Sequence, residues 1–125
     1  FNNDNHYLNY KARLFGGSLK QMILNTEKVE TVRLDTYINT EEMNTIDLLK
    51  IDTEGHEAEV LKGANKMLKK NIRYILIEFH FSKIYKNYNR IKIEKKLKKN
   101  NFKIIKKFKF PFLTFEDRIY KKSIS

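Results

Sequence analysis

The chain has 125 residues, no Cys, and a formal net charge of +11 from 26 Lys or Arg and 15 Asp or Glu. This length suits one domain, and the absence of Cys excludes disulfide bridges, a Cys-ligated zinc site and a cysteine nucleophile. With 41% hydrophobic and 13% aromatic residues, the chain can form a packed core.

The N-terminal part of the chain is polar and weakly patterned. Residues 1–28 are expected to form an irregular connection. Val29–Leu34 alternates between apolar and polar residues, which predicts a short strand. Asp35 is expected to cap a brief helix at residues 36–42. Because the chain opens on Phe1 rather than Met, we expect it to be part of a longer protein or a processed product.

The strongest pattern is a strand, a helix and a second strand. Ile46–Asp52 is a compact apolar strand that ends in a carboxylate, and Thr53-Glu54-Gly55 follows as a turn. Apolar residues then recur at helical spacing over residues 56–70, and Asn71 suits a left-handed helix end. Arg73–Phe81 has the composition of a second buried strand. A helix between two such strands predicts a right-handed crossover and a parallel pair.

The C-terminal part continues the same alternation of helix and strand. A further helix is expected to begin at Ser82 or Asn87 and to extend through Lys99. Two strands are expected at Phe102–Phe108 and Arg118–Lys122. The predicted order is β-α-β-α-β-β, which is half of an α/β sheet.

Basic residues are concentrated in the second half of the chain. Residues 1–59 carry a formal charge of −5, whereas residues 60–125 carry +16. A small basic module that binds nucleic acid or another anionic surface is therefore an alternative function. Lys outnumbers Arg 21 to 5, however, and phosphate and base recognition favours the planar Arg fork. We therefore do not expect nucleic acid to be the partner.

Several familiar signals are missing from the sequence. Aliphatic runs reach only three residues, as in Ile75–Ile77, and no basic-then-apolar leader opens the chain, so we expect a cytoplasmic protein without a membrane span. His56-Glu57 begins like a zincin helix, but Val60 occupies the position of the second His. No pair of glycines has the spacing of a phosphate loop.

Acidic residues and a histidine follow the two predicted parallel strands. Asp52 and Glu54 end the first strand, Glu78 and His80 end the second, and Glu57 lies near the start of the intervening helix. Ligands bind outside the carboxyl ends of such strands. These side chains can act as a general base, orient hydroxyls or bind a hard divalent cation. Each also has an ordinary structural reading, such as stabilising a helix N-terminus or packing in the core.

Four segments carry a specific pattern: Val32-x-Leu34-Asp35, the run from Ile46 to Glu57 that contains Lys-Ile-Asp-x-Glu-Gly-x-Glu, Val60-Leu61-Lys62-Gly63-Ala64, and Ile77-Glu78-Phe79-His80. Together they resemble the FkbM family of S-adenosylmethionine-dependent methyltransferases. Gly16-Gly17-Ser18-Leu19 is similar to a small-residue segment that precedes them in that family. The resemblance covers roughly residues 14–82, and Thr53 departs from it, since a Val-like residue is common there.

The resemblance implies a class I methyltransferase sheet with the strand order 3-2-1-4-5-7-6. Ile46–Asp52 is then strand 4, Arg73–Phe81 is strand 5, and the last two strands are the final antiparallel pair. Strands 1 to 3, the glycine-rich cofactor loop and the ribose-binding carboxylate would precede them. The expected fold class is thus α/β, a partial Rossmann-like sheet of strands 4, 5, 6 and 7 with flanking helices and without its N-terminal half. Residues 1–125 would form one partial domain.

The resemblance also implies O-methylation of a hydroxyl on a small molecule or sugar, with S-adenosyl-L-methionine as the cofactor of the full-length parent. Asp52 and His80 are the candidate catalytic residues. Glu54, Glu57 and Glu78 are the candidate substrate-binding residues. No cofactor-binding residue is assigned, and no metal is assigned, although carboxylates could bind a divalent one. We expect this chain alone to be inactive.

Overall fold

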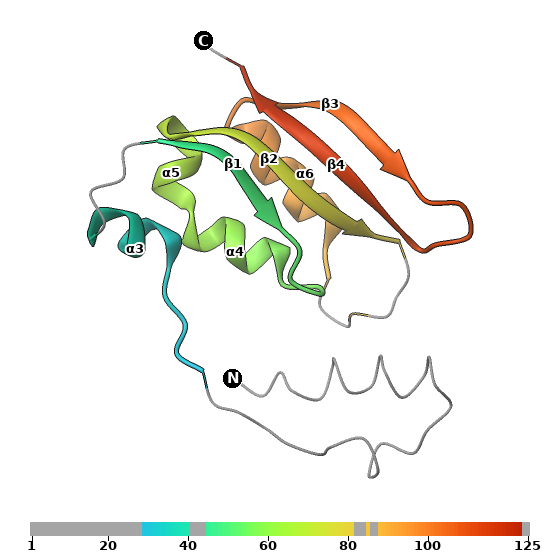
Figure 1. Ribbon diagram of the computed structural model, residues 1–125, viewed down its shortest axis with the longest axis horizontal. Coiled ribbons are helices and arrows are strands. Elements are labelled where there is room, and N and C mark those ends of the chain that lie inside the picture. Colours follow the sequence, from blue (N-terminus) through green and yellow to red (C-terminus); the bar gives the residue numbers. More distant parts are fainter. Residues whose placement is uncertain (1–28, 41–44, 82–84, 86–87, 124–125) are drawn as a thin grey trace.

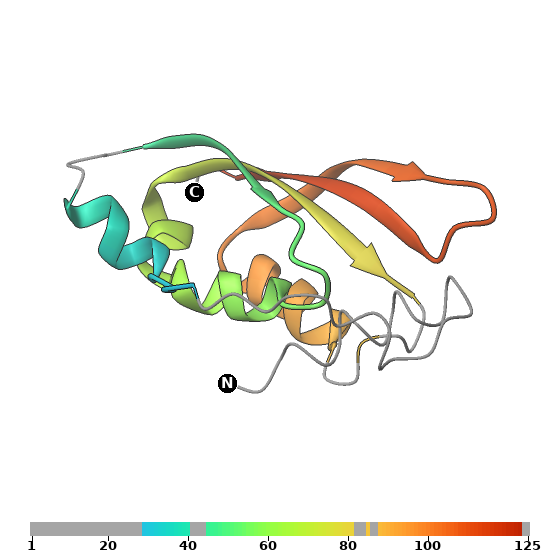
Figure 2. The ribbon, with the colours of Figure 1, turned by 60° about the horizontal axis from the view of Figure 1, so that its bottom comes forward.

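The computed structural model describes residues 29–40, 45–81, 85 and 88–123. Its strands form one sheet in the order β1-β2-β4-β3 (Figure 1). These strands are β1 (Ile46–Ile51), β2 (Ile72–His80), β3 (Phe102–Lys109) and β4 (Phe115–Lys122). The described helices are α3 (Leu34–Thr40), α4 (Glu57–Gly63), α5 (Asn65–Lys70) and α6 (Arg90–Lys99). Figure 2 shows these helices together on one face of the sheet.

The strand pairing confirms the predicted crossover. β1 and β2 are parallel, and Ile51 lies opposite Ile77. β4 is antiparallel to both β2 and β3, as expected for the last two strands. The carboxyl ends of β1, β2 and β3 therefore meet at one edge of the sheet, and this edge positions the candidate site.

The core lies between the sheet and the helical layer. Its members from both layers are 0% or 1% exposed: Ile51, Ile75, Ile77 and Phe79 from the sheet, and Leu61, Leu68, Ile93 and Leu97 from the helices. On β2 the buried residues alternate with partly exposed ones, because successive strand side chains point to opposite faces. One face of β2 is apolar because it packs against the helices. The other face carries Tyr74 and Leu76, which are partly exposed.

The predicted strand at Val29–Leu34 is wrong. Residues 29–33 have no regular structure, and Val29 and Val32 are 74% and 65% exposed. Alternation of apolar and polar residues is insufficient for a strand without a neighbour to supply hydrogen bonds. The helix expected at residues 36–42 begins earlier, at Leu34.

The predicted continuous helix over residues 56–70 is broken at Ala64, which ends α4 and precedes α5. Gly63 lies at the break, and an added Cβ there would be 3.7 Å from the Cα of Arg33. The carboxylate of Asp35 then accepts hydrogen bonds from the backbone N–H groups of Lys66 (3.0 Å) and Met67 (3.1 Å). Asp35 therefore caps α5 rather than its own helix, because the break frees these donors.

Two smaller expectations about helix ends are also wrong. Asn71 has φ −109° and ψ −5°, which is right-handed rather than left-handed backbone, and β2 begins at the next residue. The helix expected from Ser82 or Asn87 starts at Arg90, where the side chain of Asn89 accepts a hydrogen bond from the backbone N–H of Lys92 at 2.9 Å. Asn89 is therefore the cap, two residues after the later expected start.

Candidate functional site

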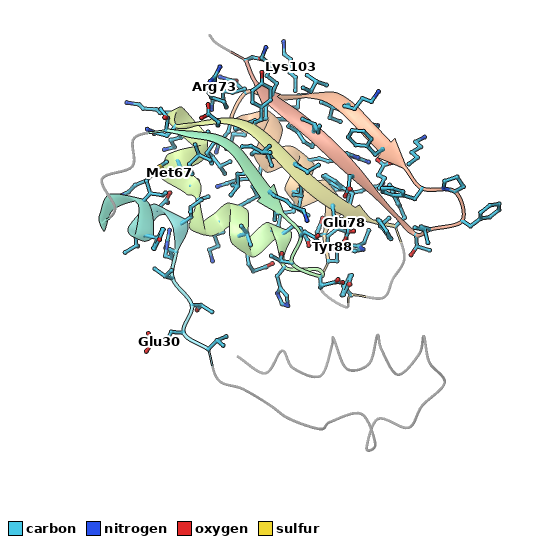
Figure 3. All side chains as sticks on the ribbon, viewed as in Figure 1. Glu30, Met67, Arg73, Glu78, Tyr88 and Lys103 are labelled. Carbon is cyan, nitrogen blue, oxygen red and sulfur yellow. The ribbon has the colours of Figure 1, made fainter. Side chains whose placement is uncertain are left out.

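The structure brings the predicted site residues to the carboxyl ends of β1 and β2. Asp52 directly follows β1, and Glu78 and His80 are among the last three residues of β2. Glu54 is in the loop after β1, and Glu57 is the first residue of α4. Figure 3 shows Glu78 and Tyr88 at this edge and Arg73 and Lys103 toward the opposite one. We call Asp52, Glu54, Glu57, Glu78 and His80 the edge cluster.

Glu57 shapes the loop that carries the cluster. It is fully buried, and its Oε1 accepts hydrogen bonds from the backbone N–H groups of Thr53 and Gly55, each at 3.1 Å. The Thr53 hydroxyl donates to the same oxygen at 3.3 Å. These bonds explain the Thr-Glu-Gly-x-Glu spacing, because a carboxylate two residues after Gly55 closes the loop on itself. Glu57 Oε2 is buried without a hydrogen-bond partner among the described residues.

Gly55 lets Tyr85 pack over this loop. Its φ is +98°, a conformation that glycine adopts readily and other residues rarely do. A Cβ at Gly55 would lie 2.6 Å from Cγ of Tyr85. The Tyr85 hydroxyl in turn donates a short hydrogen bond to the Glu54 carboxylate. Glycine is therefore required both by the turn and by the tyrosine ring above it.

Gly55→Ala should destabilise the protein by roughly 2 kcal/mol, since it adds both positive-φ strain and an overlap with the Tyr85 ring. Chemical denaturation of the variant and the wild type measures this difference. Gly63→Ala is a matched control, because the nearest atom to its added Cβ is 3.7 Å away. Equal stability of Gly55→Ala and Gly63→Ala would contradict the packing described for Tyr85.

Glu78 and His80 form a close, largely buried pair. Glu78 Oε2 lies 2.9 Å from His80 Nε2, and the two side chains are 15% and 8% exposed. This is an ion-pair distance, although Nε2 makes no hydrogen bond to a described residue. The imidazole stands edge-on to the rings of Tyr85 (4.7 Å) and Tyr88 (5.5 Å). The backbone N–H of His80 also donates to the Tyr88 hydroxyl at 3.1 Å, so both backbone and ring are held.

The electrostatics of this pair favour neutral forms. Burial, followed by the charges of Asp52 and Glu54, raises the pKa of Glu78 to about 7. Burial lowers the pKa of His80, while Glu57, Glu54 and Asp52 oppose that shift. A neutral imidazole beside a carboxyl that titrates near neutrality can accept and pass on a proton.

Asp52 and Glu54 are the exposed carboxylates of the edge cluster, and Glu54 accepts the hydrogen bond from Tyr85. Asp52 directly follows β1. Its side chain is 38% exposed, and Oδ2 lies 3.0 Å from Nζ of Lys50. A surface pair of this kind contributes little to folding. Asp52 is therefore free to contact a ligand that approaches the sheet edge.

Sequence reasoning missed three residues that shape the cluster. Tyr85 and Tyr88 precede α6 and flank His80, and Asp117 lies opposite Glu78 in the β2–β4 register. Burial raises the pKa of Asp117, and Asp52 adds to that shift. The sequence held a weak signal for the tyrosines, since aromatic residues follow the second strand, but no signal for the register of β4.

Two further findings concern the described part of the chain. Within it, no three His, Asp or Glu side chains are grouped in an arrangement that could hold a metal ion. None of its helices has the length and apolar character that crossing a membrane requires.

The mixed sheet with helices on one face and polar groups at its carboxyl edge fits a methyltransferase-like α/β fold. The methyltransferase FkbM domain matches residues 3–104, and the chain belongs to this family. Hexuronic acid methyltransferase AglP from Haloferax volcanii is 30% identical over 69 residues, which are 55% of this chain and 28% of that protein. The chain thus spans little more than a quarter of that relative's length. No solved structure matches the chain.

Proposed function

We propose that this chain forms the acceptor-binding, C-terminal part of an S-adenosylmethionine-dependent O-methyltransferase. The observation that carries the proposal is the convergence of Asp52, Glu78 and His80 at the ends of neighbouring parallel strands in an FkbM-family chain. The order β1-β2-β4-β3 supports equating these strands with strands 4, 5, 7 and 6 of a class I sheet. In such sheets ligands bind at this edge.

The described residues do not fit the whole cofactor. S-adenosylmethionine would supply the methyl group, and its nucleoside is commonly held by a glycine-rich turn after a strand and by a carboxylate near the ribose. Of the described glycines, Gly55 closes the loop after β1 and packs against the Tyr85 ring, and Gly63 packs against Arg33. Neither belongs to a glycine-rich turn of this kind. We propose that strands preceding this chain supply those contacts.

The edge cluster is suited to bind and deprotonate an acceptor hydroxyl. In this proposal the hydroxyl donates a hydrogen bond to Asp52, an exposed carboxylate, which takes up its proton as the oxygen is methylated. His80 is the alternative acceptor for that proton, with Glu78 beside it. Glu54 and Glu78 orient further hydroxyls of the substrate. Glu57 acts through the loop that it closes.

We propose a sugar hydroxyl as the acceptor, since the related archaeal protein is a hexuronic acid methyltransferase. The test is transfer of labelled methyl from S-adenosylmethionine to a panel of hexuronic acids, neutral sugars and simple alcohols by the protein that carries this chain. Label in a methyl ether of a sugar supports the proposal. Label in none of these compounds, or label in a methyl ester of the hexuronic acid carboxyl instead of an ether, contradicts it.

The 125-residue chain alone should give no measurable heat with S-adenosylmethionine in a calorimetric titration, because its described residues do not supply the cofactor contacts named above. A longer protein that includes the preceding strands should bind. One-to-one micromolar binding by the chain alone would contradict this prediction and would assign a cofactor pocket to residues 1–28, which lie outside the described part.

A further inference from the structure

The turn between β3 and β4 presents apolar side chains to solvent. Phe112 is 104% exposed, Leu113 is 54% exposed and Phe110 is 40% exposed. We call residues 110–113 the hairpin tip. In Figure 2 the β3–β4 hairpin extends past the helical layer. Because His80 pairs with Phe115, the first residue of β4, the tip projects from the same sheet edge as the edge cluster.

Phe112 has a backbone conformation that phenylalanine rarely adopts. The Leu113 N–H donates to the Phe110 carbonyl at 3.2 Å, with Pro111 second and Phe112 third at φ +67°. These are features of a type II turn, whose third position usually holds glycine or asparagine. A phenylalanine there is strained. The Phe112 ring is fully exposed and does not pack in the protein interior. The strained backbone therefore holds an aromatic side chain in solvent.

Lysines lie along β3, the first strand of the hairpin, whereas the facing strand β4 carries Glu116 and Asp117 near its start, opposite Lys109 and Phe108. Residues 102–115 contain four lysines and no acidic residue: Lys103, Lys106, Lys107 and Lys109. A register shift between Ile104 and Lys106 changes the alternation of β3, so that Lys106 lies opposite Ile119 and Lys107 opposite Arg118. Successive residues of a strand point to opposite faces, so the lysines flank the tip on both faces of the sheet. A hollow of about 410 Å³ at its base is lined by Lys107, Lys109, Phe110 and Arg118 among others.

We propose that the hairpin tip inserts into the interface of an anionic lipid membrane. Its apolar side chains would lie at the boundary of headgroups and acyl chains, and the lysines behind it would contact lipid phosphates. Single-stranded RNA would be expected to meet aromatics interleaved with basic groups. On β3 the exposed ring of Phe108 lies between Lys107 and Lys109, with Nζ of Lys106 5.8 Å from its centroid. The hairpin tip, by contrast, carries only apolar side chains and no basic residue, and this feature favours the membrane.

This placement turns the edge cluster toward the membrane surface, because the tip and the cluster share one edge of the sheet. An acceptor presented at that surface would then approach Asp52 directly. Membrane binding itself does not depend on the proposed methyl transfer. The experiment therefore measures binding alone.

The test is sedimentation of the protein with phosphatidylcholine vesicles that contain or lack phosphatidylserine. We expect binding to the anionic vesicles that weakens as salt rises. Phe112→Gly should lower the affinity at least about tenfold while the melting temperature stays the same or rises, because glycine relieves the turn. Lys107→Gln with Lys109→Gln should lower it by about 25-fold, and Lys69→Gln with Lys70→Gln on α5 is the matched control.

Unchanged vesicle binding by Phe112→Gly would overturn the proposal. A fall in the melting temperature of Phe112→Gly would also overturn it, since the ring would then pack within the protein. Labelled single-stranded RNA is added to the same assay. Tight RNA binding that the tip variants abolish, with no binding to either vesicle, would assign the surface to nucleic acid instead.

Discussion

Asp52→Asn should lower the rate of methyl transfer by about 10² to 10⁴-fold, the range typical for loss of a general base. The change removes the charge but keeps the shape, and among the described residues the partly exposed Asp52 pairs with Lys50 at the surface, so the melting temperature should hardly change. The measurement is the rate under saturating cofactor in the protein that carries this chain, with thermal unfolding of the same samples.

Asp47→Asn is the matched control for this experiment. Asp47 lies near the amino end of the same strand, is also exposed, and pairs with Arg73 at 2.7 Å. It is away from the edge cluster, so its variant should keep the wild-type rate. If Asp52→Asn also keeps that rate, Asp52 is not the base. A loss in His80→Gln alone would then move that role to His80.

The parallel pair could be predicted because its signals are local. Ile46–Asp52 and Arg73–Phe81 are apolar and flank a helical pattern of the length that a crossover needs. Their carboxyl ends then follow from topology, and with them the positions of Asp52 and His80. By contrast, the alternation at Val29–Leu34 led to a wrong strand, because no local pattern reveals whether a neighbouring strand exists.

Long-range hydrogen bonds explain what sequence reasoning missed. Asp35 was expected to cap the helix that follows it, since caps are usually local. Its true donors, the N–H groups of Lys66 and Met67, become free only because the chain breaks at Gly63 and Ala64. Asp35 and Gly63 belong to two of the family segments, so part of the family pattern serves the packing of α3 against α5.

Glu57 is a second motif residue whose described contacts are structural. Spacing placed it near the site, and the structure uses one of its oxygens to close the loop that carries Glu54. The aromatic partners of His80 come from outside its own strand: Tyr85 and Tyr88 follow β2, and Phe115 belongs to β4. Such contacts depend on the register and on the path of the loop before α6, which composition does not encode.

Glu78→Gln should make the protein more stable than wild type at about pH 8 and should lose this advantage at low pH. The pKa of Glu78 is raised from 4.5 to about 7 in the folded protein, chiefly by burial and then by Asp52 and Glu54. A raised carboxyl pKa means that the folded state holds the proton more tightly than the unfolded state does. Its contribution to stability is therefore complete below pH 4.5 and is lost as the pH rises through about 7.

The expected gain of the variant over wild type is roughly 2–3 kcal/mol at about pH 8, since glutamine cannot ionise. Denaturant unfolding of both proteins from about pH 4 to pH 8 measures the difference at each pH. Lowering of the His80 pKa acts in the opposite sense, because it destabilises the folded state as the pH falls below 6.5. The difference between Glu78→Gln and wild type separates the two effects. Glu59→Gln, on the exposed side of α4, is the control. An equal pH profile for both variants would show that burial and the neighbouring carboxylates do not raise the pKa of Glu78.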